Sequence, residues 1–544
     1  MRLIVILLFA IGIAWPAAAG GTLVLRGGAV YTLDPARPWA RAVVVRDGRI
    51  VYVGDDAGAA PYEPGARVVR LDGLMVLPGF QDSHIHLIGG GLRLTRCQLK
   101  GLTTAEAIYA AVAACAAKDK SAWLRGAGWA PEAFGARGPS LAKLDQIVGD
   151  RPAFLTTEDG FTAWVNSRAL AAGGVSDSDG VVEGEAYARI RAKAPKPSPA
   201  QYREALKAAS AMANRFGITS AVDASANDDA IDAYHAADLA NELTLRLVAA
   251  QIVDPKDGRA RIAAIMARRD AVKGRRFRAD AAKIFLDGEL EQETAALSQD
   301  YAGKPNSAGR LKADPAQIRL AVSALNYHRF LIHMHAMGDS AVTTGLDAIA
   351  SAREIERDVF GVNEVRVRHQ LAHLGLVAPA SLSAFAKIGV GSNFQPAFLL
   401  ADDRAALEAV LGPQRVGRLY PTQTVASAGA QLLISSDWPS PTMNPLEIIQ
   451  YALTRQPLDG SKPPHQPEER ITLTQALAAY TINAAWASRS DAETGSIVVD
   501  KRADLVVLDR NLFETPVGEI HKARVLLTLL DGASVYSDPS LALR

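Results

Sequence analysis

The middle of the chain alternates short apolar runs with amphipathic stretches, and this alternation constrains the fold more than any other feature. The apolar runs have the length and composition of buried strands, and the stretches between them have the period of helices. Eight such runs occur, at 74–78, 218–224, 245–252, 281–286, 330–335, 365–369, 389–393 and 431–435. Eight strands that alternate with helices are typical of a TIM-like (β/α)8 barrel. We therefore predict an α/β fold.

Both ends of the chain differ from the middle, because they are rich in predicted strands. Residues 22–26, 42–45 and 50–53 near the start, and 495–499, 503–508 and 525–536 near the end, are β-rich and are separated by turn signals such as Asp47-Gly48 and Asp531-Gly532. We predict one small β-sandwich domain built from residues 20–76 and 490–544. The barrel then occupies residues 77–489.

The connection between the first two predicted barrel strands is far longer than the others. A structureless loop from about residue 89 to 216 is implausible inside a compact domain, and the segment contains strand-like pieces and an Ala-rich helix of its own. We expect an inserted α/β subdomain that starts at the barrel mouth and shapes specificity.

The first nineteen residues have the pattern of a secretory signal peptide. Arg2 gives a positive start, 3–15 is an apolar run too short to span a membrane, and Ala17-Ala18-Ala19 is an A-x-A cleavage signal. We expect cleavage after Ala19 and export to the periplasm or the medium, with no membrane association afterwards. An uncleaved anchor is the alternative.

Composition and charge limit the class of protein and the kinds of molecule that it can bind. Of the 544 residues, 49% are hydrophobic and 22% are charged, which excludes a disordered or fibrous chain. The net charge of +1 provides no general attraction for nucleic acid. We expect a small-molecule substrate, and the sequence leaves homo-oligomer formation open. Cys97 and Cys115 are the only cysteines, and a disulfide and two free buried thiols both remain compatible with them.

The strongest chemical signal is the run Pro78-Gly79-Phe80-Gln81-Asp82-Ser83-His84-Ile85-His86. Residues two apart at the end of a strand point the same way, so His84 and His86 can both offer ring nitrogens to one metal ion. Four further polar residues lie at the ends of later predicted strands, where barrel enzymes place their chemistry. They are Lys283, His335, His373 and Asp437.

Together these motifs resemble the amidohydrolase superfamily, in particular the family 3 branch of YtcJ-like metal-dependent hydrolases. The resemblance rests on the run at 78–86, on Lys283 before Asp287-Gly288, on 335–339, on 436–439, on 47–50 and on 503–508. It covers nearly the whole mature chain. It implies a distorted barrel beside a small β-sandwich, with divalent metal at the carboxyl ends of the strands.

The resemblance also implies roles for individual residues. Two divalent ions, for which we expect zinc, are held by His84, His86 and Asp437 and by His335 and His373, with carboxylated Lys283 shared between them. Asp437 takes a proton from the attacking water and passes it to the leaving nitrogen. Lys283 and His373 complete the expected catalytic set.

Three of these assignments have rivals. His333 precedes His335 on the same strand, and we expect it to face the opposite side. His369 competes with His373 as a ligand. Lys283 could instead form a salt bridge at a site with one metal ion.

The chain departs from its relatives at two positions. Phe161 stands where relatives often carry His, and Ala372 stands where they commonly carry Glu. These changes leave the six expected ligands intact and bear on the substrate. Candidate walls of an apolar substrate pocket are Trp129, Phe161, Trp164 and Trp438, although aromatic residues are also common in a plain core.

The function that we predict is an exported, metal-dependent hydrolase that cleaves a carbon-nitrogen bond, in an amide, formamide or N-acyl compound, with a metal-activated water. The same metal site could instead serve a deaminase or a hydrolase of esters or lactones. A catalytically inactive binding protein is the alternative of another class. The complete ligand set argues against it.

Overall fold

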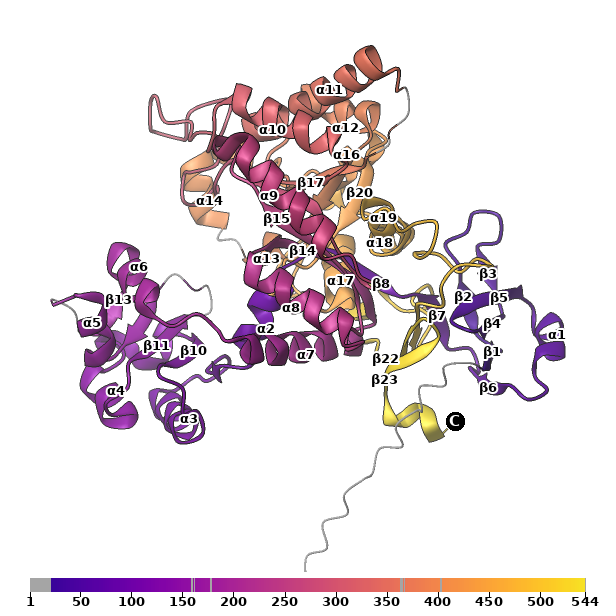
Figure 1. Ribbon diagram of the computed structural model, residues 1–544, viewed down its shortest axis with the longest axis horizontal. Coiled ribbons are helices and arrows are strands. Elements are labelled where there is room, and N and C mark those ends of the chain that lie inside the picture. The colour runs from indigo at the N-terminus through magenta and orange to yellow at the C-terminus, as the bar shows by residue number, and fades with distance from the viewer. Residues whose placement is uncertain are drawn as a thin grey trace, which may run out of the picture. The chain divides into compact units, whose positions relative to one another are not determined.

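The structure is a computed structural model, which describes residues 21–543 apart from 158, 159, 161, 177, 178, 363, 364, 366, 402 and 403. The expected signal peptide lies outside the described residues. The chain divides into two compact units (Figure 1), one made of Met1–His86 with Ala211–Arg544 and the other of Leu87–Ser210. Each unit is described by itself.

The larger unit contains a barrel of eight parallel strands. Neighbouring strands pair in chain order. At the carboxyl ends of the first and last strands, the His86 amide donates to the Trp438 carbonyl at 2.9 Å and the Asp437 amide donates to the His84 carbonyl at 2.8 Å, which links the two edges. The strands are β8 (Phe80–Ile85), β14 (Ile218–Ala226), β15 (Arg246–Ile252), β16 (Phe277–Phe285), β17 (Leu331–Ala336), β18 (His369–His373), β19 (Val390–Phe394) and β20 (Gln431–Ile434).

Two of the predicted barrel strands were wrong. Residues 74–78 do not start the barrel, because β7 (Met75–Pro78) pairs with strands of the sandwich and β8 follows it after Gly79. Both β7 and β8 are buried throughout, so apolarity alone does not separate them. The sixth strand was placed at 365–369, but Val365 is exposed and the strand begins at His369.

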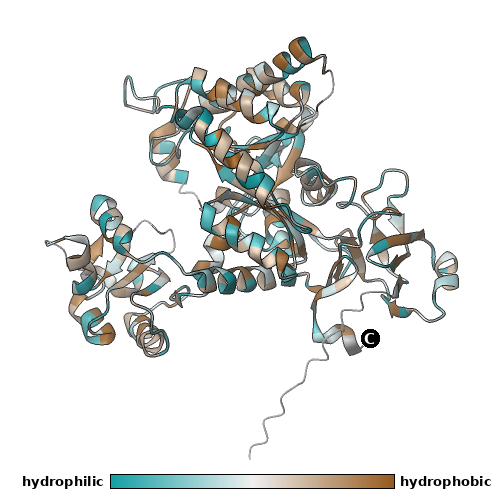
Figure 2. Cartoon of the chain, viewed as in Figure 1, coloured by the Kyte–Doolittle hydropathy of each residue, from teal (hydrophilic) through white to brown (hydrophobic). Residues whose placement is uncertain are grey.

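Helices cover the barrel, and local sequence signals set their ends. The Asn227 side chain accepts from the Ala230 amide at the start of α8 (Asp228–Leu239), and Asp314 forms a capping box with Gln317 at α10 (Pro315–Tyr327). Gly361, in the left-handed conformation, ends α11 (Asp339–Phe360). Figure 2 shows apolar and polar residues side by side along these helices, as expected for helices with one face on the sheet. The other long helices are α9 (Gly258–Ala271) and α17 (Pro445–Thr454).

Both chain ends build the β-sandwich. One sheet has the order β5-β4-β1-β6 and the other β23-β22-β21-β7-β2-β3. Their inner faces share one core, in which Val43 and Val45 of the first sheet cluster with Val76, Val507 and Leu527 of the second. The strands are β1 (Thr22–Arg26), β2 (Ala29–Tyr31), β3 (Trp39–Ala40), β4 (Ala42–Arg46), β5 (Arg49–Gly54), β6 (Arg67–Arg70), β21 (Leu505–Leu508), β22 (Val525–Leu530) and β23 (Ala533–Ser537).

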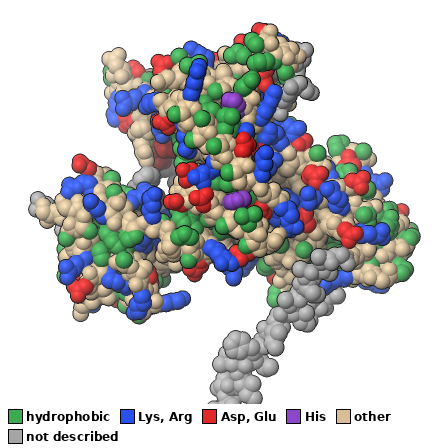
Figure 3. Space-filling view, viewed as in Figure 1, with side chains coloured by type: hydrophobic (Ala, Val, Ile, Leu, Met, Phe, Trp, Pro, Cys, Tyr) green, Lys and Arg blue, Asp and Glu red, His purple; other side chains and the backbone are tan. Residues whose placement is uncertain are grey.

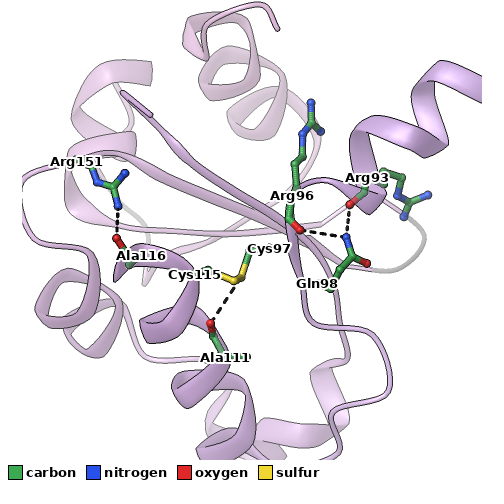
Figure 4. Close-up of a disulfide and its surroundings, with 8 residues drawn as sticks. All are labelled: Arg93, Arg96, Cys97, Gln98, Ala111, Cys115, Ala116 and Arg151. Carbon is green, nitrogen blue, oxygen red and sulfur yellow. Dashed lines mark hydrogen bonds between the residues drawn. A yellow bond between two sulfur atoms is a disulfide. The ribbon is translucent and has the colours of Figure 1, made fainter. Parts of the chain in front are cut away.

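The smaller unit is an α/β subdomain with a five-stranded sheet in the order β13-β12-β11-β10-β9. It contains α2 (Leu87–Leu94), β9 (Cys97–Gln98), α3 (Ala105–Lys118), β10 (Leu124–Trp129), α4 (Leu141–Val148), β11 (Ala153–Thr157), β12 (Ala163–Val165), α5 (Ser167–Gly173), β13 (Val181–Val182), α6 (Gly184–Lys193) and the start of α7 (Pro199–Arg215). A disulfide joins Cys97 on β9 to Cys115 on α3 (Figure 4), with their Cα atoms 5.6 Å apart. The alternative of two free thiols is therefore not what the structure contains.

The surface agrees with the balanced charge of the sequence. On the face in view in Figure 3, cationic and anionic side chains are interspersed. Among the described residues, no helix combines the length and the apolarity that crossing a membrane requires.

Candidate metal centre

Three of the expected ligands meet where the first and last barrel strands end. His84 lies at the end of β8, His86 directly follows this strand, and Asp437 lies just beyond β20. Asp437 Oδ1 is 3.4 Å from His84 Nε2 and 3.0 Å from His86 Nε2. Two ligands at about 2.1 Å from one zinc ion and at a tetrahedral angle are about 3.4 Å apart, so these separations suit one shared ion.

Two more expected ligands lie beside them. His373 ends β18, and its Nδ1 is 3.9 Å from Asp437 Oδ2. The His335 ring, near the end of β17, has its centroid 4.5 Å from that of His373. His84, His373 and Asp437 each offer one ligand atom, and these atoms all lie within 4.8 Å of one another. The structure thus brings five of the six expected residues to one place.

Lys283, the sixth, is buried on β16 with 1% of its surface exposed. Its Nζ lies 4.8 Å from the centroid of the Phe285 ring, and this nitrogen makes no hydrogen bond or ion pair with any other described residue. Burial lowers the pKa of Lys283 to about 8. Its charge also acts on His84 and His373, which places it electrostatically within the same group.

The protonation of the histidines suits metal binding. Burial, together with the charge of Lys283, holds the pKa of His84 well below its ordinary value, and burial together with the charge of His335 lowers the pKa of His373 to about 3. Both imidazoles are therefore neutral. Buried His84 Nε2 and His373 Nδ1 have no hydrogen-bond partner among the described residues. Neutral ring nitrogens with free lone pairs beside a carboxylate fit a divalent ion.

Other side chains occupy the ring nitrogens that point away from the centre. His84 Nδ1 is 2.9 Å from His333 Nε2, and His335 Nδ1 is 3.1 Å from Asp287 Oδ1. Asp287 is itself held by the amides of Met337 and Gly338. Such contacts fix the tautomer and orientation of a ligating histidine.

These contacts correct the prediction for His333. We expected it to face away from His335, but side chains two residues apart on a strand lie on the same face, and His333 packs against His84. The other rival, His369, uses both ring nitrogens elsewhere. Its Nδ1 accepts from the Ile332 amide at 3.1 Å and its Nε2 lies 2.9 Å from Asn326 Oδ1.

Two acidic residues near the centre were missed. Glu289 follows β16, and its Oε1 lies 3.1 Å from His335 Nε2. Asp82 is fully buried two residues before His84, and burial raises its pKa to about 7. The signal for Glu289 was an acid just beyond Asp287-Gly288, after the strand that carries the lysine.

The backbone is strained at two of the expected ligands. His373 has φ of 78° and Asp437 has φ of 50°, both in the left-handed region that favours glycine. Such conformations cost about 1–3 kcal/mol each and concentrate at functional sites. His373 ends β18 and Asp437 lies three residues beyond β20, so both strained positions lie at the carboxyl ends of barrel strands.

The candidate pocket residues divide among different surroundings. Trp438 follows Asp437 and is 6% exposed. Trp129 and Trp164 are buried in the core of the smaller unit, where the Trp129 indole donates to the Leu155 carbonyl at 2.8 Å. Phe161 lies outside the described residues.

Comparison with known proteins adds a family match. Residues 67–536 match a family described as "Amidohydrolase family". The Arabidopsis thaliana protein named "Protein LONG AFTER FAR-RED 3" is 30% identical over 96% of this chain and 92% of its own. The Arthrobacter pascens "N-substituted formamide deformylase" is 27% identical over 93% of this chain and 97% of its own. The Bacillus subtilis protein YtcJ is 28% identical over 94% of this chain and 98% of its own.

Solved structures agree on the fold. A crystal structure from Pyrococcus furiosus, described as an uncharacterized metal-dependent hydrolase, has a TM-score of 0.75 at 24% identity and covers 90% of this chain and 99% of that one. A Pyrococcus horikoshii protein with the same description has a TM-score of 0.76 at 22% identity and covers 91% of this chain and 99% of that one.

Proposed function

This chain belongs to the amidohydrolase family and is a hydrolase of carbon-nitrogen bonds, and we propose that it cleaves an amide, formamide or N-acyl bond in a small molecule with an apolar portion. The observation that carries the proposal is the group of neutral, unpartnered imidazole nitrogens around Asp437. A purely structural cluster would satisfy these nitrogens with hydrogen bonds.

The proposed centre holds two divalent ions, with zinc as the expected metal. His84, His86 and Asp437 would bind one ion, and His335 and His373 would bind the other. Glu289 is an additional ligand of the second ion. Its carboxylate and the His335 ring lie at the separation of two atoms bound to one ion. Bound ions of this kind lower the pKa of water and polarise a carbonyl group.

Lys283 is proposed to carry a carboxyl group. Its neutral amine would attack CO2, so that a nitrogen-carbon bond forms while one C=O π bond opens onto oxygen, and an amine proton would pass to water. The product would be an anionic carbamate. Two features support this role. The side chain has no partner among the described residues, and the lowered pKa increases the fraction of neutral amine at neutral pH.

Asp437 is proposed to move the proton. Its carboxylate accepts a proton from the attacking water and later donates it to the nitrogen of the leaving group. The contact with His86 lowers the pKa of Asp437 despite its burial, so the side chain starts as the base that this step requires.

Export is part of the proposal. The A-x-A signal before Gly20 supports cleavage of a signal peptide, and the Cys97–Cys115 disulfide suits an oxidising compartment. Cell fractionation followed by N-terminal sequencing tests it, with Gly20 as the expected first residue. An intact start in the membrane fraction would favour an uncleaved anchor.

The decisive experiment is a hydrolysis screen with metal analysis. Protein purified without chelators should contain about two divalent ions per chain. It should hydrolyse formamides, N-acyl amino acids or simple amides faster than esters, lactones or ring amines. The Arthrobacter pascens relative makes N-substituted formamides the first compounds to test. Metal content near zero after supplementation with zinc or manganese would refute the proposal, and exclusive activity on esters or ring amines would reassign the bond.

A further inference from the structure

The smaller unit contains a cavity of about 440 Å³ that is separate from the metal centre. All of its lining residues fall within Leu87–Ser210, and none is an expected metal ligand. The wall comes from β9, β10, the end of α3 and the segment that leads into α7. Its cationic and sulfur-bearing residues are Arg96, Arg125, Lys118, Lys196, Cys97 and Cys115.

Two guanidinium groups of this wall lack the partners that buried arginines normally have. The Arg96 guanidinium makes no hydrogen bond or ion pair with any other described residue. Arg125 Nε is buried without a partner, and its one hydrogen bond within the described chain is a long one of 3.4 Å from Nη1 to the Pro195 carbonyl. Both side chains are partly shielded from water, so bulk solvent does not fully replace the missing contacts.

A third arginine of the same unit shows what a satisfied guanidinium looks like. Arg151 donates to the carbonyls of Asp119, Ser121 and Ala116 at 2.7, 2.9 and 3.0 Å. Figure 4 draws Arg151 on the Ala116 carbonyl and the Arg96 side chain extending away from the disulfide, while the dashed line at Arg96 marks its backbone carbonyl, which accepts from Gln98. The unit therefore pairs an arginine where its role is structural, and it leaves Arg96 and Arg125 unpaired.

Among the described residues, the charges of Arg96 and Arg125 also lack a compensating carboxylate. Burial and the charges of Arg125 and Arg191 lower the pKa of Arg96 to about 9, and burial and Arg191 lower the pKa of Arg125. Two acids line the cavity, but Asp119 accepts from the Ser121 amide, and neither Asp119 nor Glu204 forms an ion pair with Arg96 or Arg125. Two neighbouring cations without a nearby carboxylate make the local electrostatic potential positive. A bound anion would lower this potential.

We propose that this cavity binds a multiply charged oxyanion of the phosphate type, held between Arg96 and Arg125. A guanidinium presents a planar pair of donors that matches two oxygens of such an anion. Lys118, which also lines the cavity, adds positive charge, so the site favours two or more negative charges over one. The site goes beyond the hydrolysis proposed above and shares no residue with it.

Calorimetry on the metal-loaded mature chain tests the site with inorganic phosphate, pyrophosphate, citrate and acetate at constant ionic strength. We expect one site per chain, at least about tenfold tighter for phosphate or pyrophosphate than for acetate. Arg96→Gln and Arg125→Gln should each weaken binding about tenfold or more. Arg168→Gln is the matched control, because Arg168 is an exposed arginine of the same unit already paired with Asp150. Tighter binding of citrate would make the ligand a polycarboxylate within the same proposed site.

Phosphate could also reach the metal centre, so Asp437→Asn must retain the Arg96-dependent binding. Unfolding temperature gives a second measurement. In anion-free buffer Arg96→Gln should be at least as stable as the wild type, since it removes an unpaired charge, and phosphate should raise the unfolding temperature of the wild type only. If Arg96→Gln fails to fold, Arg125→Gln gives the same two readouts. No saturable binding up to about 10 mM, or equal binding by both glutamine variants, would overturn the proposal.

Discussion

The two ends of the barrel handle buried polar groups in opposite ways. At the amino end, Arg246 donates to both carboxylate oxygens of Asp504 at 2.7 and 3.1 Å. Asp531 accepts from Arg276 at 2.8 Å, from Arg502 at 3.0 Å and also from Arg246. Asp504 and Asp531 belong to the sandwich, so this network ties the sandwich to the start of β15 and β16. Its charges are paired.

At the carboxyl end several buried polar groups are left unpaired, beside the contacts that His86 and His335 make with carboxylates. His84 Nε2 and His373 Nδ1 are buried without hydrogen-bond partners among the described residues, and the Lys283 ammonium has no carboxylate partner there. Paired charges stabilise a fold, whereas unpaired groups cost stability and persist where a ligand completes them. We therefore expect a variant at the amino end to change stability, and a variant at the carboxyl end to change activity and metal content.

The largest effect is expected at Lys283. Lys283→Ala should lower activity by about 10³-fold or more, because it removes the anionic ligand that we propose the two ions share. A small carboxylic acid such as formate or propionate, added in bulk, should restore part of the activity by replacing the carbamate. Initial rates with and without the acid measure both effects.

A second variant separates function from stability at the same position. Lys283→Met keeps most of the volume and removes the ammonium that is unpaired in the metal-free protein. In metal-free buffer it should therefore unfold at the same temperature as the wild type or above it, and with metal it should remain inactive. A fully active Lys283→Ala enzyme would remove Lys283 from the centre. A strongly destabilised Lys283→Met enzyme would give it the structural role seen at the other end of the barrel.

The next largest effect is expected for Asp437→Asn. The amide keeps the size of the side chain and can still offer an oxygen to metal, but it cannot accept the proton from water. Turnover should fall by about 10² to 10⁴-fold with a smaller change in KM. Metal content must be measured on the same sample, since lost metal would enlarge the effect.

Asp459→Asn, at an exposed aspartate of the same unit, is the matched control and should keep full activity. An Asp437→Asn enzyme with its metal and near-normal turnover would show that another group moves the proton. His373, the nearest other titratable ligand to the Asp437 carboxylate after His84 and His86, would then be examined first.

A variant at the amino end of the barrel should lower stability and leave activity unchanged. Asp531→Asn leaves the guanidiniums of Arg246 and Arg276 with one fewer carboxylate, and the loss should be about 2–3 kcal/mol in the free energy of unfolding, with kcat unchanged. Urea unfolding of the holoenzyme measures it. Asp150→Asn, at an exposed ion pair with Arg168, is the control and should cost less than about 1 kcal/mol.

This effect also has a predicted pH dependence. Burial would raise the pKa of Asp531, but Arg246 and Arg276 hold it far below its ordinary value. The contribution of Asp531 is therefore fully present above the unfolded pKa of about 4 and is lost as the pH falls below it towards the folded pKa. The difference in stability between wild type and Asp531→Asn should shrink below about pH 4. A difference that stayed constant there would mean that the carboxylate charge is not what stabilises this end.

The sequence predicted the barrel because its strands are apolar runs with helical stretches between them, a pattern set by local burial. It also indicated which residues end those strands, and the structure brings His84, His86, His335, His373 and Asp437 together. The boundary between sandwich and barrel was misplaced because β7 and β8 are equally buried, and only their pairing partners distinguish them.

The surroundings of the ligands were harder to predict. That Asp287 holds His335 depends on how the loop after β16 folds back, and no period or motif in the sequence encodes this path. The same loop carries Glu289 to the other nitrogen of that ring. Contacts made by irregular segments are set by tertiary structure, so sequence patterns identify the ligands at or just beyond strand ends and miss a contact such as that of Glu289.

The smallest of the expected effects is that of replacing Glu289. Asp287 occupies His335 Nδ1, so the Nε2 that faces the Glu289 carboxylate at 3.1 Å must bear either a proton or a metal ion. The two carboxylates raise the pKa of His335 despite its burial, which is the response expected where a cation belongs between the two groups. Glu289→Gln should therefore weaken binding of the second metal equivalent by about tenfold and leave the first unchanged.

Metal titration followed by calorimetry, with elemental analysis after dialysis, measures the two equivalents of Glu289→Gln separately. Glu291→Gln, two residues further along the same loop and exposed, is the matched control and should bind both ions as the wild type does. The side chain of Glu289 is 47% exposed, so its removal should change the free energy of unfolding by less than about 1 kcal/mol. A variant that keeps both metal affinities but loses affinity for substrates with a positive charge would make Glu289 a substrate contact. A variant that changes only stability would show that the carboxyl end also contains a paired, structural carboxylate, and the contrast between the two ends would fail at this residue.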